Sequence, residues 1–264
     1  MRPFAPLLAL AALLTGCWTD HHRVADVAWS EDDQAQAWIE HRYEQKDSVG
    51  SGLIGSPKRR NHSLRVGVRR PDGSGARFVT PWLPGEPAAG DLYLQRQAGY
   101  VLYSVQRGDA RTVAAAPLNG GDPWALRTAD TEGACGDLRG LPNPAGDVIA
   151  VLERFGVAEG PGCDAQDVRI TFFEAASRAV LDDVSVTIDA GVEWAWDQGA
   201  LFVWNFRGTT WRFAPGQPPA PAERPACTWP RTASSNTSAD GITLETGTPA
   251  APIAVAGQGP PPCR

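Results

Sequence analysis

Short apolar runs that repeat every second residue constrain the fold of this chain more than any other feature. In residues 64–69, Leu-Arg-Val-Gly-Val-Arg, the three apolar side chains all fall on one side of an extended strand. Runs of this kind end at Gly, Pro, Asp or Asn, which favour turns. With 28 Gly and 23 Pro, the chain has little room for long helices. The pattern therefore predicts an all-β protein.

The expected strands are spread over most of the chain. They are 27–30, 36–43, 64–69, 78–79, 92–94, 100–105, 148–152, 168–173, 184–188, 192–196, 201–206 and 210–213. Residues 30–44 also contain helix-favouring Glu, Gln and Ala, but we interpret them as a turn between two strands. His41 alternates with polar neighbours in the second of these strands, and we expect its side chain to be exposed.

A weak internal repeat distinguishes among the all-β architectures. Three segments, 27–39, 141–152 and 192–204, each consist of a strand, a polar tight turn and an apolar strand. The clearest turn is Asn-Pro-Ala-Gly at 143–146, followed by Val-Ile-Ala-Val-Leu at 148–152. This repeat resembles the TolB-type β-propeller repeat, whose core reads approximately Ser-Pro-Asp-Gly followed by an apolar strand. Here Ala stands in place of the usual Asp.

The resemblance implies blades of four strands that stack around an axis, because one blade cannot bury both of its faces. The ten Trp residues suit the gaps between such blades. Residues 27–216 supply about four blades, which is the smallest number that propellers use. We therefore expect a small or irregular β-propeller of about four blades, with a β-sandwich as the alternative.

The N-terminus carries a signal for export. Arg2 precedes the apolar run Leu7–Leu14, which is too short to span a bilayer and has the layout of a secretory signal. The run ends in Leu14-Thr15-Gly16-Cys17, which resembles the lipobox of bacterial lipoproteins. The resemblance implies cleavage before Cys17, acylation of its thiol and its new amine, and stable membrane attachment. An ordinary secretory signal that ends in Cys is the alternative.

These features divide the chain into four segments. Residues 1–16 are the predicted lipoprotein signal peptide, and residues 17–26 a tether to the lipid. Residues 27–216 are the propeller-like domain, and residues 217–264 a Pro-rich linker with a disulfide-stapled tail. Trp18 would be the second mature residue, where an Asp retains enteric lipoproteins in the inner membrane. The resemblance therefore favours the outer membrane of a bacterial cell envelope.

Cysteine usage agrees with export. Besides Cys17, the chain contains Cys135, Cys163, Cys227 and Cys263. An even number in an exported chain predicts disulfides, and four cysteines allow three connectivities. We favour Cys135–Cys163 and Cys227–Cys263, because each pair brackets one local segment and would stabilise the fold by roughly 3 kcal/mol. A zinc site is disfavoured, because the sequence has no CxxC pair.

The charge distribution gives no footprint for nucleic acid, because the net charge is −6. The only lysines are Lys46 and Lys58. One basic cluster comprises residues 58–60 (Lys-Arg-Arg) with Arg65, Arg69 and Arg70. We interpret this cluster as a solvated loop and strand edge rather than as a polyanion site.

No catalytic motif is recognisable. The chain lacks a Walker loop, a Rossmann glycine pattern, a G-x-S-x-G elbow and an H-E-x-x-H helix. We therefore expect no catalytic residues, no metal and no cofactor. Trp194, Trp196, Trp204 and Trp211 form a dense aromatic stretch. They are either blade core or a platform on which a sugar ring or peptide stacks.

Two functions fit these observations. The first is a membrane-anchored envelope lipoprotein whose β-domain binds or scaffolds a protein or glycan without catalysis. The alternative is a surface-anchored hydrolase, which would need two or more carboxylates roughly 5–10 Å apart in a propeller funnel. The missing motifs favour the first function, and the question of enzymatic activity stays open.

Overall fold

The computed structural model describes residues 18–46, 58–88, 90–131, 136–155, 165–189, 192–205 and 208–225. These residues form β-strands and turns, without a helix among them. The predicted all-β class is therefore confirmed. The segment 30–44 is a turn followed by a strand, as expected from its alternation.

The strands form four antiparallel sheets, which we call blades 1 to 4. Blade 1 contains β1 (Trp18–Trp29), β2 (Gln36–Lys46), β3 (Lys58–Arg69), β4 (Arg77–Phe78) and β5 (Leu83–Pro84). Blade 2 contains β6 (Glu86–Pro87), β7 (Tyr93–Gln95), β8 (Tyr100–Arg107), β9 (Ala110–Pro117) and β10 (Trp124–Asp130). Blade 3 contains β11 (Asp137–Pro142), β12 (Val148–Phe155), β13 (Ala165–Glu174) and β14 (Val180–Asp189). Blade 4 contains β15 (Val192–Asp197), β16 (Ala200–Asn205), β17 (Thr210–Phe213) and β18 (Ala220–Pro221).

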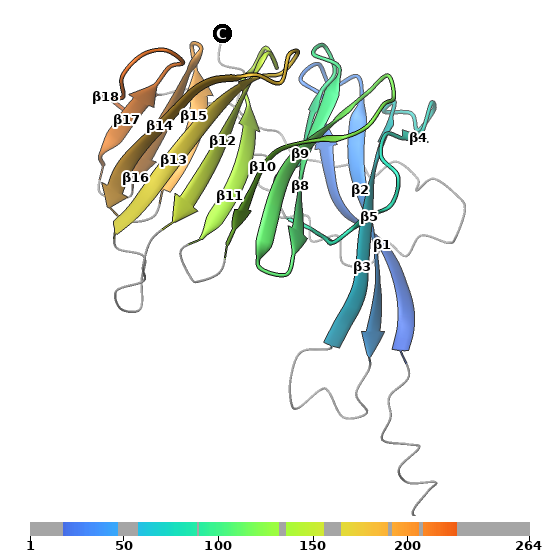
Figure 1. Cartoon of the computed structure of the whole chain (residues 1–264). Helices are drawn as coiled ribbons and strands as arrows, with labels where there is room; N and C mark the ends of the chain where they lie inside the picture. Colours follow the sequence, from blue (N-terminus) through green and yellow to red (C-terminus); the bar gives the residue numbers. More distant parts are fainter. Residues whose placement is uncertain are drawn as a thin grey trace, which may run out of the picture.

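The blades follow one another in chain order as an open fan, with blade 4 at one end and blade 1 at the other (Figure 1). Within each blade, neighbouring strands of the sheet pair antiparallel. In blades 1 and 2 one outermost position is divided between two short strands, β4 with β5 and β6 with β7. The described sheets do not close into a ring. The fold is therefore the expected irregular β-propeller of four blades rather than a sandwich.

Apolar side chains fill the gaps between successive blades. Between blades 1 and 2, Ile39 and Leu64 belong to the same buried cluster as Val101. Between blades 3 and 4, the rings of Phe172 and Trp196 meet edge to face with centroids 5.9 Å apart. Each blade thus buries faces that it could not bury alone.

Two segment boundaries differ from the sequence expectation. Residues 18–26, expected as part of a tether, instead form most of β1 and pair with β2 from Trp18 onward. The polar sequence Thr-Asp-His-His at 19–22 hid this strand, because its end projects past the apolar core. Residues 220–221, expected in the linker, form β18 in blade 4. Segments 1–17 and 226–264 lie outside the described residues.

His41 is not exposed as expected, since only 2% of its surface is accessible. Its ring lies 5.0 Å from the Tyr43 ring and 5.2 Å from the His62 ring, and its Nε2 is 3.0 Å from Nδ1 of His62. Burial, with the nearby positive charges, lowers the pKa of His41 to about 3. Polar neighbours in sequence misled the expectation, because aromatic rings from the same sheet face cover this side chain.

Gly140 allows β11 to approach blade 2 closely. A Cβ at this position would lie 2.6 Å from Cγ1 of Val113 and 3.0 Å from Cδ2 of Leu102. Gly140→Ala is therefore expected to lower the free energy of unfolding by about 1–3 kcal/mol, through overpacking between two blades. Urea unfolding measures this loss.

Val113→Ala in the Gly140→Ala background provides the matched control. Removing the contacted methyl groups is expected to restore part of the loss, so that the two changes are not additive. Strict additivity would show that Gly140 acts through something other than this contact.

Candidate functional site

The inner strands of the four blades bring polar and aromatic side chains to the propeller axis. Asp26 lies on β1, Tyr93 on β7, Arg139 on β11 and Trp194 on β15. The guanidinium carbon of Arg139 lies 5.6 Å from the centroid of the Trp194 ring. Burial raises the pKa of Tyr93, and the charges of Asp26 and Arg139 both act on the same phenol. One side chain from each blade therefore contributes to this region, and we call these four side chains the axis cluster.

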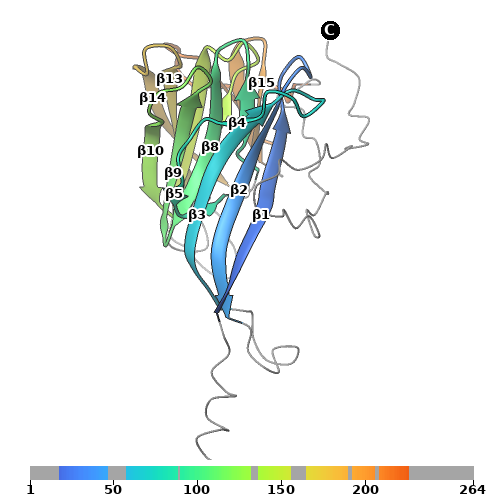
Figure 2. The ribbon, with the colours of Figure 1, turned by 90° about the vertical axis from the view of Figure 1, so that its right-hand side faces the viewer.

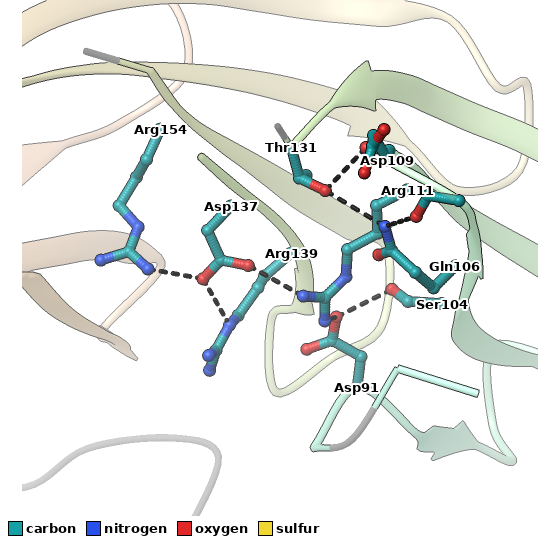
Figure 3. Close-up of polar contacts among 10 residues, drawn as sticks. Asp91, Ser104, Gln106, Asp109, Arg111, Thr131, Asp137, Arg139 and Arg154 are labelled. Carbon is teal, nitrogen blue, oxygen red and sulfur yellow. Dashed lines mark hydrogen bonds and ion pairs between the residues drawn. The ribbon is translucent and has the colours of Figure 1, made fainter. Parts of the chain in front are cut away.

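A network of ion pairs centred on Arg111 joins blade 2 to blade 3 (Figure 3). From β9, Arg111 donates through Nη2 to Oδ2 of Asp91 at 2.6 Å and through Nη1 to Oδ1 of Asp137 at 2.8 Å. Ser104 Oγ also donates to Oδ2 of Asp91, at 2.8 Å. A single guanidinium thus bridges carboxylates from two different blades.

Asp137 is the second centre of the network, as Figure 3 shows. Its Oδ2 accepts hydrogen bonds from Nε of Arg139 at 2.9 Å and from Nη2 of Arg154 at 2.6 Å. Since Arg111 binds the other oxygen, three arginines surround this one carboxylate. Two carboxylates and three guanidinium groups leave the network with an excess of positive charge.

The two carboxylates are shifted in opposite directions. Burial raises the pKa of Asp91 to about 6, although Arg111 and Ser104 act against this rise. Oδ1 of Asp91 is buried without a hydrogen-bond partner. Burial would also raise the pKa of Asp137, but Arg139, Arg154 and Arg111 outweigh it and hold this pKa below its usual range. Burial therefore dominates at Asp91, whereas three arginines outweigh it at Asp137.

Accessibility separates structural members of the network from those that can meet a ligand. The side chains of Asp91 and Arg111 are 2% and 12% exposed. Arg139 is the open member, with 43% of its side chain exposed. Arg139 and the half-buried Trp194 therefore form the part of the axis that a ligand can reach.

The structure does not bring the four tryptophans onto one surface. Trp196 is 1% exposed, and Trp194 and Trp211 pack against the same buried cluster between blades 3 and 4. Trp204 lies on the opposite face of blade 4, where its Nε1 donates to Glu193 at 2.9 Å. Their arrangement matches the interpretation of these tryptophans as blade core. Of the four, Trp194 is the one that lies beside Arg139.

The other predicted sites cannot be placed. Cys17, Cys135, Cys163, Cys227 and Cys263 lie outside the described residues, so lipidation and disulfide pairing stay predictions. Within the described ranges, no group of three or more His, Cys, Asp or Glu side chains could hold a metal ion. The same ranges contain no helix long and apolar enough to cross a bilayer.

Sequence reasoning missed Asp91, Arg111, Asp137 and Arg139, because they belong to no motif and lie up to dozens of residues apart. The sequence marks them only where charged and apolar residues alternate, as in Asp137-Leu138-Arg139. That alternation places both charges on the same face of a strand. It does not reveal that Arg111 of another blade faces them.

Comparison with known proteins finds distant likenesses to solved structures only. No protein-family model matches the sequence, and no curated protein matches it. Among solved structures, the chain is similar to the β-propeller domain of the Trilobed protease from Pyrococcus furiosus. The identity is 9% and the TM-score 0.47, covering 77% of this chain and 57% of that one.

Two further solved structures are also distantly similar. Acylaminoacyl peptidase from Pyrococcus horikoshii has 6% identity and a TM-score of 0.48, covering 77% of this chain and 33% of that one. TolB from Acinetobacter baumannii has 13% identity and a TM-score of 0.36, covering 82% and 59%. This chain spans less than two thirds of each of these chains, and no activity or residue role is carried over from them.

Asp91→Asn is expected to change how stability depends on pH. In the wild type the pKa of Asp91 is raised to about 6 from an unfolded value of about 3.9. The folded state therefore binds this proton more tightly than the unfolded state does. The resulting contribution to the free energy of unfolding is fully present below pH 4 and is lost as the pH rises to 6. The variant lacks this loss. Its free energy of unfolding relative to wild type should increase between pH 4 and 6.5, by up to about 3 kcal/mol.

Urea unfolding at pH 4, 5 and 6.5 makes the comparison. Asp137→Asn is the matched control, because its pKa is lowered and its stabilisation is present at neutral pH. A stability difference for Asp91→Asn that does not vary with pH would contradict the assignment of a raised pKa.

Arg111→Met is expected to destabilise the protein strongly, because it leaves buried Asp91 without its ion-pair partner. Breaking a buried pair in this way costs about 3–5 kcal/mol. Thermal or urea unfolding measures the loss. Arg169→Gln is the control, since it breaks a solvent-exposed pair with Asp183 and should change stability little. Equal effects of the two variants would show that the Arg111 network does not hold the blades together.

Proposed function

We propose that this chain is a lipid-anchored protein of the bacterial cell envelope whose propeller binds a partner without catalysis. The observation that carries the proposal is the exposed Arg139 beside Trp194 on neighbouring inner strands. The partner is a protein or glycan that presents a carboxylate next to an apolar or aromatic surface.

The chemistry of this pair supports recognition of such a group. A guanidinium binds a carboxylate by two parallel hydrogen bonds, and Arg139 has donors beyond the one it gives to Asp137. The Trp194 ring offers a face on which a sugar ring or an aromatic side chain can stack. The exposed guanidinium of Arg139 attracts an anion to this position.

The carboxylates of the network do not favour the hydrolase alternative. Hydrolysis of a glycoside needs an acid and a base that both reach the substrate. Asp91 is buried, and both oxygens of Asp137 accept hydrogen bonds from arginines. Their opposite pKa shifts resemble those of an acid–base pair, but their burial and pairing suit a structural role.

The anchor rests on the lipobox resemblance at Leu14-Thr15-Gly16-Cys17 and on the apolar run before it. Envelope localisation, with the outer membrane favoured, follows from the same resemblance and from Trp18 after Cys17. A domain that is permanently anchored and binds a carboxylate next to an apolar surface can act as a scaffold or receptor for other envelope components.

The anchor is tested by mass spectrometry of the N-terminal peptide from the native protein. We expect a peptide that begins at Cys17 and carries acyl chains, and a Cys17→Ala variant that is not acylated. A mature peptide that begins elsewhere, or an unmodified Cys17, would remove the anchor from the proposal.

The binding site is tested by cross-linking in intact cells with wild type, Arg139→Gln and Arg169→Gln. We expect a partner that is cross-linked by wild type and by Arg169→Gln, and reduced at least about fivefold by Arg139→Gln, in line with loss of a charged hydrogen bond. Trp194→Phe keeps the packing and should give an intermediate loss. Equal capture by all variants would place the binding surface elsewhere.

A further inference from the structure

Blade 1 has an end that projects beyond the rest of the described structure. β1, β2 and β3 extend past the other blades, and Figures 1 and 2 show their ends pointing away from the body of the fan. We call this end the tip, and define it by Trp18, Lys46, Lys58, Arg59 and Arg60. Trp18 pairs with Lys46, and Lys46 pairs with Lys58, so these three lie side by side on one face.

The positive charges at the tip do not stabilise the fold. Lys46 and Lys58 are the only lysines of the chain, yet they stand directly opposite each other on neighbouring strands. Like charges in this position destabilise a sheet. Within the described residues, neither lysine forms a salt bridge. An anion from outside the sheet would relieve this repulsion.

Aromatic and further basic side chains border the two lysines. Arg60 lies on the same face as the lysines, and its guanidinium is 3.9 Å from the centroid of the Trp18 ring. On the opposite face of the sheet, the guanidinium of Arg59 lies 4.8 Å from the centroid of the Tyr43 ring. Glu44 pairs with Arg60, whereas the two lysines and Arg59 have no carboxylate partner among the described residues. Tryptophan beside lysine and arginine is the combination that occupies the interface between a bilayer and water.

The position of the tip identifies the anion. Trp18 directly follows Cys17, and consecutive Cα atoms lie about 3.8 Å apart. A lipid on Cys17 would therefore hold the tip at the bilayer surface, because β1 begins at the next residue and leaves no tether between them. Anionic phospholipid headgroups would then lie within reach of both lysines.

We propose that the tip is a docking surface for anionic phospholipid headgroups, in which Lys46 and Lys58 bind phosphate and Trp18 lies at the headgroup level. This inference rests on the proposed lipid anchor at Cys17 and extends it. Blade 1 then acts as a rigid stalk that holds the other blades away from the bilayer in a fixed orientation. The axis cluster stays accessible to envelope partners.

Acylation of lysine by an amine-reactive ester tests the docking, because Lys46 and Lys58 are the only lysine targets. The native protein is reconstituted in vesicles of phosphatidylglycerol, in vesicles of phosphatidylcholine and in neutral detergent. Peptide mass spectrometry follows the modification of each lysine. We expect acylation to slow at least about fivefold in phosphatidylglycerol, the effect of one basic residue at an anionic surface, and high salt to abolish this protection.

A pair of charge reversals at the two ends of β3 provides the matched control. Lys58→Glu should remove most of the protection of Lys46 in phosphatidylglycerol vesicles. Arg70→Glu makes the same charge change just past the other end of the strand and should leave that protection unchanged. Equal protection in both variants would overturn the proposal.

Two other outcomes are informative. Equal acylation rates in all three environments, for protein whose Cys17 is shown to be acylated, would overturn the docking surface and leave the anchor intact. An unmodified Cys17 would remove the anchor instead, and phosphatidylglycerol vesicles would still test the tip by the same protection. If inorganic phosphate in detergent protects both lysines as well as the vesicles do, the site binds a free anion and the lipid surface is overturned.

Discussion

The burial of sheet faces between neighbouring blades is the interaction on which the rest of this structure depends. Each blade is too thin to form a core by itself, so its apolar face must meet the face of the next blade. Leu102 and Val113 of blade 2 meet Gly140 of β11 so closely that a single Cβ would not fit. This packing fixes where the inner strands lie, and therefore which side chains reach the axis.

The Arg111 network is placed by that packing and adds specificity to it. Charges buried between blades lose their hydration, and a pair repays this loss only when its partners are well aligned. Arg111 aligns with carboxylates from blades 2 and 3, so the ion pairs favour one relative position of the two blades. Arg139 follows from the same arrangement, because it is the partner of Asp137 that remains open to solvent.

The candidate sites differ in how far they could be predicted. The alternation in 64–69 placed a strand correctly, and the tight turn at 143–146 marks the β11–β12 hairpin. The aromatic stretch drew attention to Trp194 and to Trp204, but register places these two on opposite faces. The strand at Trp18 was missed, because polar residues predict a tether wherever a strand extends past its core. The lysine pair was visible only as two isolated residues.

The sequence by itself determined the class of fold and the local pairing of strands. Alternation of period two and Gly- or Pro-rich turns act between residues that are close along the chain, so they can be read without coordinates. Only the tertiary structure decided which blade faces meet, that Asp91, Arg111 and Asp137 share one network, and that Lys46 stands opposite Lys58. These contacts join residues far apart in the chain. Blade packing and strand register determine them, and no local sequence pattern indicates either one.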